Sequence, residues 1–67
     1  MNNDMLKGKW NQIKGGVKSQ WGELTDDDLT QAEGEYEKLV GKIQERYGYE
    51  REQAEREVND FMHRMSR

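Results

Sequence analysis

A run of carboxylates between residues 23 and 28 is the first place to look for chemistry in this 67-residue chain. Glu23 and the triplet Asp26-Asp27-Asp28 suggest a metal site at first sight. Calcium loops, however, alternate their ligands and need a glycine turn followed by a bidentate glutamate. Consecutive aspartates at a helix start instead oppose the positive end of the helix dipole. The pattern therefore favours helix capping over metal binding.

Thr25 is the predicted N-cap of this helix. Its hydroxyl can accept a hydrogen bond from the Asp28 amide, while the Asp28 carboxylate can accept one from the Thr25 amide. Leu24 and Leu29 lie on either side of this capping box, at the spacing of a hydrophobic staple. We expect a short helix from here to about Gln31.

Three lysines, Lys7, Lys14 and Lys18, fall on one stripe of the first predicted helix. Residues 1–22 carry a net charge of +3, from four lysines and one aspartate, whereas residues 23–35 carry −6, from six acids and no base. The stripe could bind phosphate groups weakly. It could also be a solvated face that is attracted over long range by the acidic segment. The second interpretation is favoured, because a few lysines give only weak, salt-labile binding.

Residue types that often carry catalysis lack the partners that they would need. His63 is the only histidine, the chain has no cysteine, and the only serines are Ser19 and Ser66. Neither a catalytic dyad nor a zinc site of the usual ligands is expected. The glycine spacing fits no phosphate loop or dinucleotide fingerprint. We predict that the protein is not an enzyme and has no catalytic, cofactor-binding, metal-binding or small-molecule site.

The elements that carry these residues follow from a 15-residue pattern that occurs twice. Residues 8–22 (GKWNQIKGGVKSQWG) and residues 34–48 (GEYEKLVGKIQERYG) match at an offset of 26. Each copy has glycines at both ends and in the middle, with two aromatic and two aliphatic residues between them. The apolar positions recur every three or four residues, which indicates one face of a helix.

The two copies of this pattern supply most of the first and the third of four predicted helices. The first begins at a cap, Asn3 or Asp4, and the third covers residues 35–47. We expect Gly22 and Gly48 to end these helices in the left-handed conformation that glycine adopts readily.

The other helices are the short one after Thr25, which a break at Gly34 separates from the third, and a fourth that starts near Glu50. Glu52 and Arg56 form one of several opposite-charge pairs on the outer side of the fourth helix. The residues of this helix that should point inward are Ala54, Val58, Phe61, Met62 and Met65.

Aromatic side chains could stack nucleic-acid bases. All of them except Tyr49 occupy core positions of the predicted helices, however, and a domain of this size needs those rings inside. The core interpretation is therefore favoured for Trp10, Trp21, Tyr36, Tyr47 and Phe61.

Four glycines, Gly8, Gly15, Gly34 and Gly41, fall nearly opposite the apolar face of their helices. Each is expected to destabilise a helix by about 1 kcal/mol relative to alanine. They could form a smooth outer groove where a partner approaches. Tolerance of low helix stability is the favoured explanation, because exposed glycine has no chemistry of its own.

Composition indicates a folded domain with a thin core. Only 31% of the residues are apolar and 37% are charged, and the mean hydropathy is −1.35. These values would suit a disordered chain, but aromatic residues placed twice at helical spacing argue against disorder. No apolar run could span a bilayer and no signal peptide is apparent. We therefore expect a cytoplasmic monomer, and a net charge of −3 does not indicate a nucleic-acid partner.

The sequence resembles the CsbD-like family of small bacterial stress-response proteins, and within it the YjbJ type. The resemblance rests on residues 10–15 (WNQIKG), 21–28 (WGELTDDD) and 41–48 (GKIQERYG), together with Ala54-Glu55. It covers nearly the whole chain and is weakest after Val58. It implies a single compact all-α domain over residues 1–67, arranged as a SAM-domain-like orthogonal bundle of four to five helices. It also implies abundance under general, osmotic or stationary-phase stress, with no catalytic residues to carry over.

These observations together predict a non-enzymatic stress-response protein. The two copies of the repeat, residues 8–22 and 34–48, should be related by a pseudo-twofold axis around one core. The alternative is a weak nucleic-acid- or protein-binding module that uses Lys7, Lys14 and Lys18.

Overall fold

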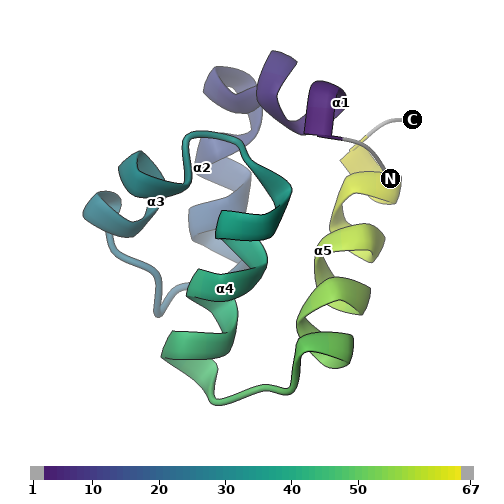
Figure 1. Ribbon diagram of the computed structural model, residues 1–67. Helices are drawn as coiled ribbons and strands as arrows, with labels where there is room; N and C mark the ends of the chain where they lie inside the picture. The colour runs from purple at the N-terminus through teal and green to yellow at the C-terminus, as the bar shows by residue number, and fades with distance from the viewer. Residues whose placement is uncertain (1–2, 66–67) are drawn as a thin grey trace.

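Helices account for all the regular secondary structure in the part of the chain that is described, so the predicted all-α class is confirmed. The computed structural model describes residues 3–65, without the side chains of residues 3–5. Figure 1 shows α4 at the centre of the fold, with α5 beside it and α2 behind. The five helices are α1 (Asn3–Gly8), α2 (Trp10–Gln20), α3 (Asp26–Ala32), α4 (Tyr36–Tyr47) and α5 (Arg51–Met65).

The first predicted helix is in fact two helices, because the chain bends at Lys9. Lys9 has φ −110° and ψ 10°, outside helical geometry, and its carbonyl accepts hydrogen bonds from the amides of Gln12 and Ile13 at 2.9 Å. A new helix therefore starts here. Gly8, a poor helix former, ends α1 directly before the bend. The caps predicted at Asn3 or Asp4 involve side chains outside the described residues.

One of the two predicted glycine stops is confirmed and the other is wrong. Gly48 follows α4 in the left-handed conformation, with φ 72°, and its amide bonds to the Gln44 carbonyl. Gly22 does not have a positive φ. Trp21 occupies the C-cap position of α2 instead, with φ −121°. This rotation out of the helix accompanies the burial of the Trp21 ring, which is 1% exposed.

Gly34 is the glycine whose predicted outward position is wrong. It lies in the turn between α3 and α4 with φ 76°, directly after Glu33, which also has a positive φ of 50°. A Cβ atom on Gly34 would lie 2.9 Å from the Lys7 Cα and 3.0 Å from the Trp10 Cβ. The turn therefore packs against the junction of α1 and α2, and the absence of a side chain at Gly34 permits that approach. The predicted break at this glycine is confirmed.

A single hydrophobic core receives side chains from every helix. Trp21 and Phe61 pack with ring centroids 5.3 Å apart, which joins the end of α2 to α5. The buried apolar residues are Leu6, Trp10, Ile13, Val17, Trp21, Leu24, Leu29, Ala32, Leu39, Val40, Ile43, Ala54, Val58, Phe61 and Met62.

Two predictions about the edge of the core are wrong. Tyr49, which was expected outside it, is partly buried against it and stacks on Tyr47 with centroids 5.2 Å apart. Met65, which was expected inside it, is 43% exposed and is the last residue of α5. Tyr36 and Tyr47 pack against the core while remaining partly exposed.

The glycines provide a direct test of this packing. Gly41 lies in the middle of α4, and a Cβ there would meet nothing within 4 Å. Gly41→Ala should therefore raise the free energy of unfolding by up to about 1 kcal/mol. Gly34→Ala should lower it by about 2 kcal/mol or more, because alanine disfavours a positive φ and its Cβ would overlap Lys7 and Trp10. Urea unfolding followed by circular dichroism measures both, and equal effects of the two substitutions would contradict the assigned packing.

Candidate functional site

Asp28 is the one buried charged residue of the described chain, with 3% of its surface exposed. It occupies the third helical position of α3, where the predicted capping box is confirmed. The Asp28 amide donates to the Thr25 Oγ1 at 3.0 Å, and the Thr25 amide donates to the Asp28 Oδ2 at 3.0 Å. Leu24 and Leu29, the predicted staple, are both buried. The acidic run thus begins a helix, as the sequence indicated.

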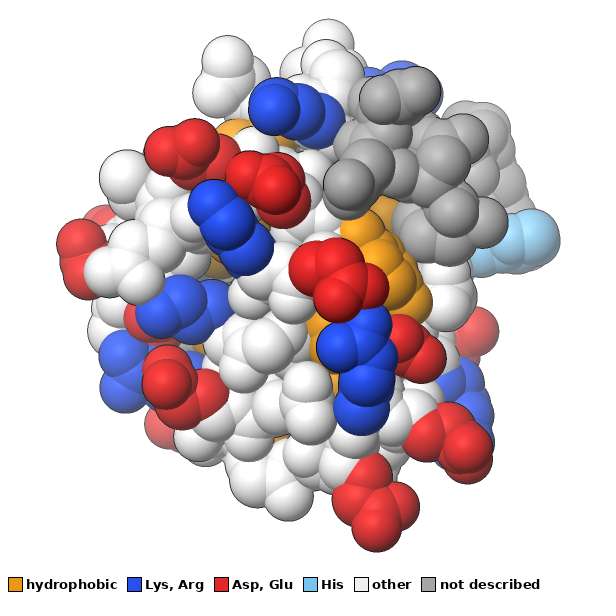
Figure 2. Space-filling model, in the orientation of Figure 1, with side chains coloured by type: hydrophobic (Ala, Val, Ile, Leu, Met, Phe, Trp, Pro, Cys, Tyr) orange, Lys and Arg blue, Asp and Glu red, His pale blue; other side chains and the backbone are white. Residues whose placement is uncertain are grey.

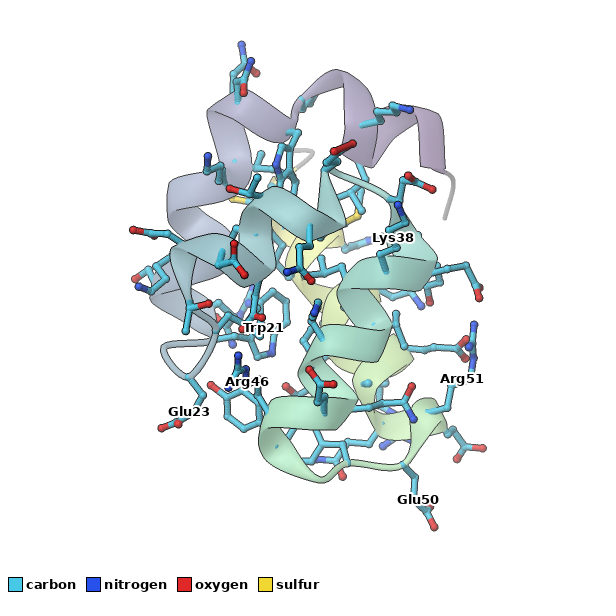
Figure 3. All side chains as sticks on the ribbon, turned by 60° about the vertical axis from the view of Figure 1, so that its left-hand side comes forward. Trp21, Glu23, Lys38, Arg46, Glu50 and Arg51 are labelled. Atoms are coloured by element: carbon cyan, nitrogen blue, oxygen red, sulfur yellow. The ribbon has the colours of Figure 1, made fainter. Side chains whose placement is uncertain are left out.

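The same carboxylate also forms an ion pair with α4. Arg46 donates from Nε to Oδ2 of Asp28 at 2.7 Å and from Nη2 to Oδ1 at 3.1 Å. Lys42, one turn earlier on α4, places its Nζ 3.7 Å from Oδ1. Figure 3 shows Arg46 extending from α4 toward the turn that joins α2 to α3. Both carboxylate oxygens are therefore satisfied, which is what burial of a charge requires.

These contacts hold the pKa of Asp28 well below its ordinary value of 3.8. The hydrogen bonds from Arg46 are the largest cause, followed by the hydrogen bond from the Thr25 amide, and the positive charges of Arg46 and Lys42 act in the same direction. Burial opposes them, since it disfavours the charged form. Asp28 is therefore ionised throughout the physiological pH range.

The partner of Asp28 was not predicted from the sequence. The capping box is a local pattern, whereas Arg46 lies 18 residues further along the chain. A signal did exist: Lys42 and Arg46 share one face of α4, so a face with two positive charges is available to a helix that carries an acid. Pairing them with Asp28 requires knowledge of how α3 packs on α4.

The polar atoms of the aromatic residues also bind to protein groups. The Trp21 Nε1 donates to Glu57 Oε1 on α5 at 3.0 Å. The Tyr47 hydroxyl accepts a hydrogen bond from the Glu23 amide at 3.2 Å. Trp10, Trp21 and Phe61 are buried, which confirms their predicted place in the core.

The three lysines predicted as a partner strip lie along one surface groove. We define the α2–α3 groove as two adjoining hollows, each of about 380 Å³, that share Asn11 and Lys14. Lys7 and Lys14 line one hollow, and Lys14 and Lys18 line the other. The structure thus brings all three lysines to a single feature.

The opposite wall of the α2–α3 groove comes from α3 and the residue that follows it, and it is partly acidic. Glu33 faces the Lys7 end, and Asp26 faces the Lys18 end. The Lys18 Nζ is 3.9 Å from Asp26 Oδ1. The attraction between lysine strip and acidic segment that the sequence indicated is therefore present at this end.

Three of the four glycines predicted to face outward do so, and each lines a hollow. Gly8 and Gly15 line the α2–α3 groove. Gly41 lines a hollow of about 580 Å³ between α3 and α4, together with Lys38 and Lys42.

The remaining candidates from the sequence stay apart from these features. His63 is exposed near the end of α5. No group of three or more histidine, aspartate or glutamate side chains that could hold a metal ion occurs among residues 3–65, whose placement is described.

Comparison with the sequences of known proteins places the chain in a family. The sequence model of the CsbD-like family matches residues 4–56. The chain belongs to the CsbD-like family. It is 62% identical over 61 residues to the UPF0337 protein YjbJ of Escherichia coli K12, and the matched region covers 91% of this chain and 88% of YjbJ. It is 58% identical over 65 residues to a UPF0337 protein of Pseudomonas aeruginosa, covering 97% of this chain and 100% of that protein.

A third relative is a UPF0337 protein of Bordetella pertussis, 59% identical over 64 residues, with 96% of this chain and 97% of that protein covered.

The CsbD-like match, over residues 4–56, includes all the residues around Asp28 but ends within α5. Val58, Phe61 and Met62, which are buried, lie beyond it, and so does Glu57, the acceptor for Trp21. The helix nevertheless continues to Met65, and the core depends on this last part.

Among the described residues of this CsbD-like chain, no helix combines the length and apolar character needed to traverse a bilayer.

Removing the charge of Asp28 should destabilise the fold in a pH-dependent way. Asp28→Asn should lower the free energy of unfolding near pH 7 by about 2 kcal/mol, because Arg46 loses a charge-assisted partner. The pKa of Asp28 is lowered on folding, so its contribution is complete above about pH 4 and is lost progressively as the pH falls. The difference between wild type and variant should therefore shrink below that pH in urea unfolding experiments.

Asp27→Asn is the matched control for this substitution. Asp27 lies in the same turn of α3 but is exposed, and among the described residues it accepts a hydrogen bond from Gln31, four residues along the helix. It removes the same charge from the same helix end. If Asp27→Asn destabilises as much as Asp28→Asn, the effect belongs to the helix dipole and not to the pair with Arg46.

Proposed function

We propose that this chain is a non-catalytic bacterial stress-response protein that acts through hydration or through weak, multivalent contacts of its charged surface. Membership of the CsbD-like family is the observation that carries the proposal. The stress concerned is general, osmotic or stationary-phase stress, as the resemblance to this family implies. The chain acts in the cytoplasm, as one domain over residues 1–67.

The surface supports this proposal. Figure 2 shows positive and negative side chains interspersed over the visible face, without a large area of one charge. Such a surface is strongly hydrated and disfavours tight binding to a single highly charged partner. It agrees with the mean hydropathy of −1.35.

The buried polar groups also support a structural rather than a catalytic role for the interior. Every buried side-chain nitrogen or oxygen atom of the described residues has a hydrogen-bond partner. Asp28, whose pKa is strongly perturbed, is held by Thr25, Arg46 and Lys42. Ion-pair networks of this kind perturb pKa values without taking part in a reaction.

We propose further that the helices form a SAM-domain-like bundle with an internal pseudo-twofold relation. Trp10 and Tyr36, equivalent in the repeat, are the first residues of α2 and α4. Trp21 and Tyr47, also equivalent, lie where these helices end. A short turn and a further helix follow each copy, α3 in one case and α5 in the other.

The stress role is tested by deleting the gene and measuring survival. Cells without the protein should survive osmotic shock or desiccation less well than wild type, and a plasmid copy of the wild-type gene should restore survival. A plasmid copy of Gly34→Ala, which should destabilise the fold, is expected to restore it only in part. Unchanged survival of the deletion strain under every stress applied would refute the proposal.

A second candidate is a weak polyanion-binding module that uses Lys7, Lys14 and Lys18. The observation in its favour is that these lysines line one groove. The acidic residues Asp26 and Glu33 on the opposite wall act against it, because they repel phosphate groups.

NMR titration with a DNA or RNA oligonucleotide at low salt tests this candidate. Binding should move the amide signals of Lys7, Lys14 and Lys18 first, and salt should reverse the shifts. Charge reversal at Lys14 should abolish them. Shifts centred elsewhere, or none at low ionic strength, would remove polyanion binding by this groove from consideration.

A further inference from the structure

The charges of the α2–α3 groove are largely unpaired within the chain. In the part of the chain that the structure describes, Lys7, Lys14 and Glu33 form no ion pair. The one contact across the groove, from Lys18 to Asp26, is long at 3.9 Å, and the Asp26 side chain is 92% exposed. Both walls of the groove therefore present charges that a partner could neutralise.

The groove between α3 and α4 differs in this respect. Lys38 pairs with Glu35 at 3.2 Å. Lys42 lies 3.7 Å from Asp28 and 3.9 Å from Glu45. The cations of that groove are already compensated by acids of the same chain, so the α2–α3 groove is the stronger candidate for a contact surface.

The order of charges along the α2–α3 groove identifies what would fit it. One wall is basic, with Lys7, Lys14 and Lys18 in order. The other wall is acidic, with Glu33 opposite Lys7 and Asp26 opposite Lys18. A nucleic acid complements only the first wall, because phosphates repel the second. A partner must carry acids and bases in two parallel rows to complement both.

A second copy of the chain meets this requirement. If a twofold axis runs parallel to the groove, the rotation exchanges the two walls and keeps the order of residues along them. Lys7 of each copy then faces Glu33 of the other, and Lys18 faces Asp26. Gly8 and Gly15 place no side chain in the groove, with nothing within 4 Å of either Cβ position, so the walls are free to approach.

We propose that the α2–α3 groove is the contact surface of a weak, salt-sensitive homodimer with a twofold axis along the groove. This goes beyond the stress role and does not rest on it. Exposed ion pairs are individually weak, so the chain is a monomer when dilute, as the sequence indicated, and associates at high concentration and low salt.

A charge-swap experiment tests the dimer. Lys7→Glu makes both walls acidic at one end of the groove, and Glu33→Lys makes both basic. Each variant alone should associate less than wild type, because the twofold axis repeats every like-charge contact. An equimolar mixture of the two should recover association, since glutamate then faces lysine in both contacts. Sedimentation equilibrium at low and high salt, over a range of concentrations, measures this.

Lys38→Glu is the matched control, since it makes the same charge change in the groove between α3 and α4. It should leave self-association unchanged. Circular dichroism verifies that each variant is folded. If either charge reversal unfolds the chain, the neutral variants Lys7→Gln and Glu33→Gln replace them, since each weakens the same contacts.

Three results would overturn the proposal. The wild type could remain monomeric at all concentrations at low salt. The mixture could associate no better than its components. Finally, a DNA oligonucleotide could bind the groove of a chain that remains monomeric, in which case the surface belongs to a polyanion. None of these results bears on the survival experiment.

Discussion

Burial of the Asp28 carboxylate is a constraint that the arrangement of α3 and α4 must satisfy. A charge with 3% exposure is tolerated only when it is paired and hydrogen-bonded. Thr25 supplies one donor from the turn before α3, and Arg46 supplies two from the last turn of α4. A single side chain thereby couples the start of one helix to the end of another, and it specifies how the two helices are positioned in a domain with little apolar material.

The chain is small, so it can bury only a limited apolar area, and most of its apolar side chains are needed in the core. Every helix contributes buried side chains, and α5 contributes four although part of it lies beyond the family match. Gly34 allows the turn between α3 and α4 to reach the α1–α2 junction. The exposed glycines, by contrast, make their helices less stable than alanine would. This is common, because natural proteins are rarely more stable than their function requires.

Local patterns in the sequence predicted much of this fold. The capping box at Thr25, the αL stop at Gly48 and the apolar faces of α2, α4 and α5 all depend on residues close together in the chain. The bend at Lys9 and the position of Gly34 do not, because the turn at Gly34 packs against Lys7 and Trp10, on either side of the bend. Helical periodicity continues through Gly8 and Lys9, so it gives no sign of the bend.

The features of the candidate site likewise fall into those that the local sequence predicts and those that depend on how the helices pack. The lysine strip follows from helical spacing, whereas the ion pair of Asp28 with Arg46 and the acidic wall opposite the strip depend on the packing of α3 between its neighbours.

The connections between helices are short, and backbone hydrogen bonds close two of them. Lys9 alone separates α1 from α2, and residues 33–35 and 48–50 separate the later helices. The turn after α2 is closed by a bond from the Leu24 amide to the Trp21 carbonyl, and the turn after α3 by one from Glu35 to Ala32. Proteolytic cleavage concentrates at exposed loop tips, and connections of one to five residues leave little such backbone between α1 and α5. Turnover of this part of the protein in the cell should therefore follow the fraction of molecules that are unfolded at any moment.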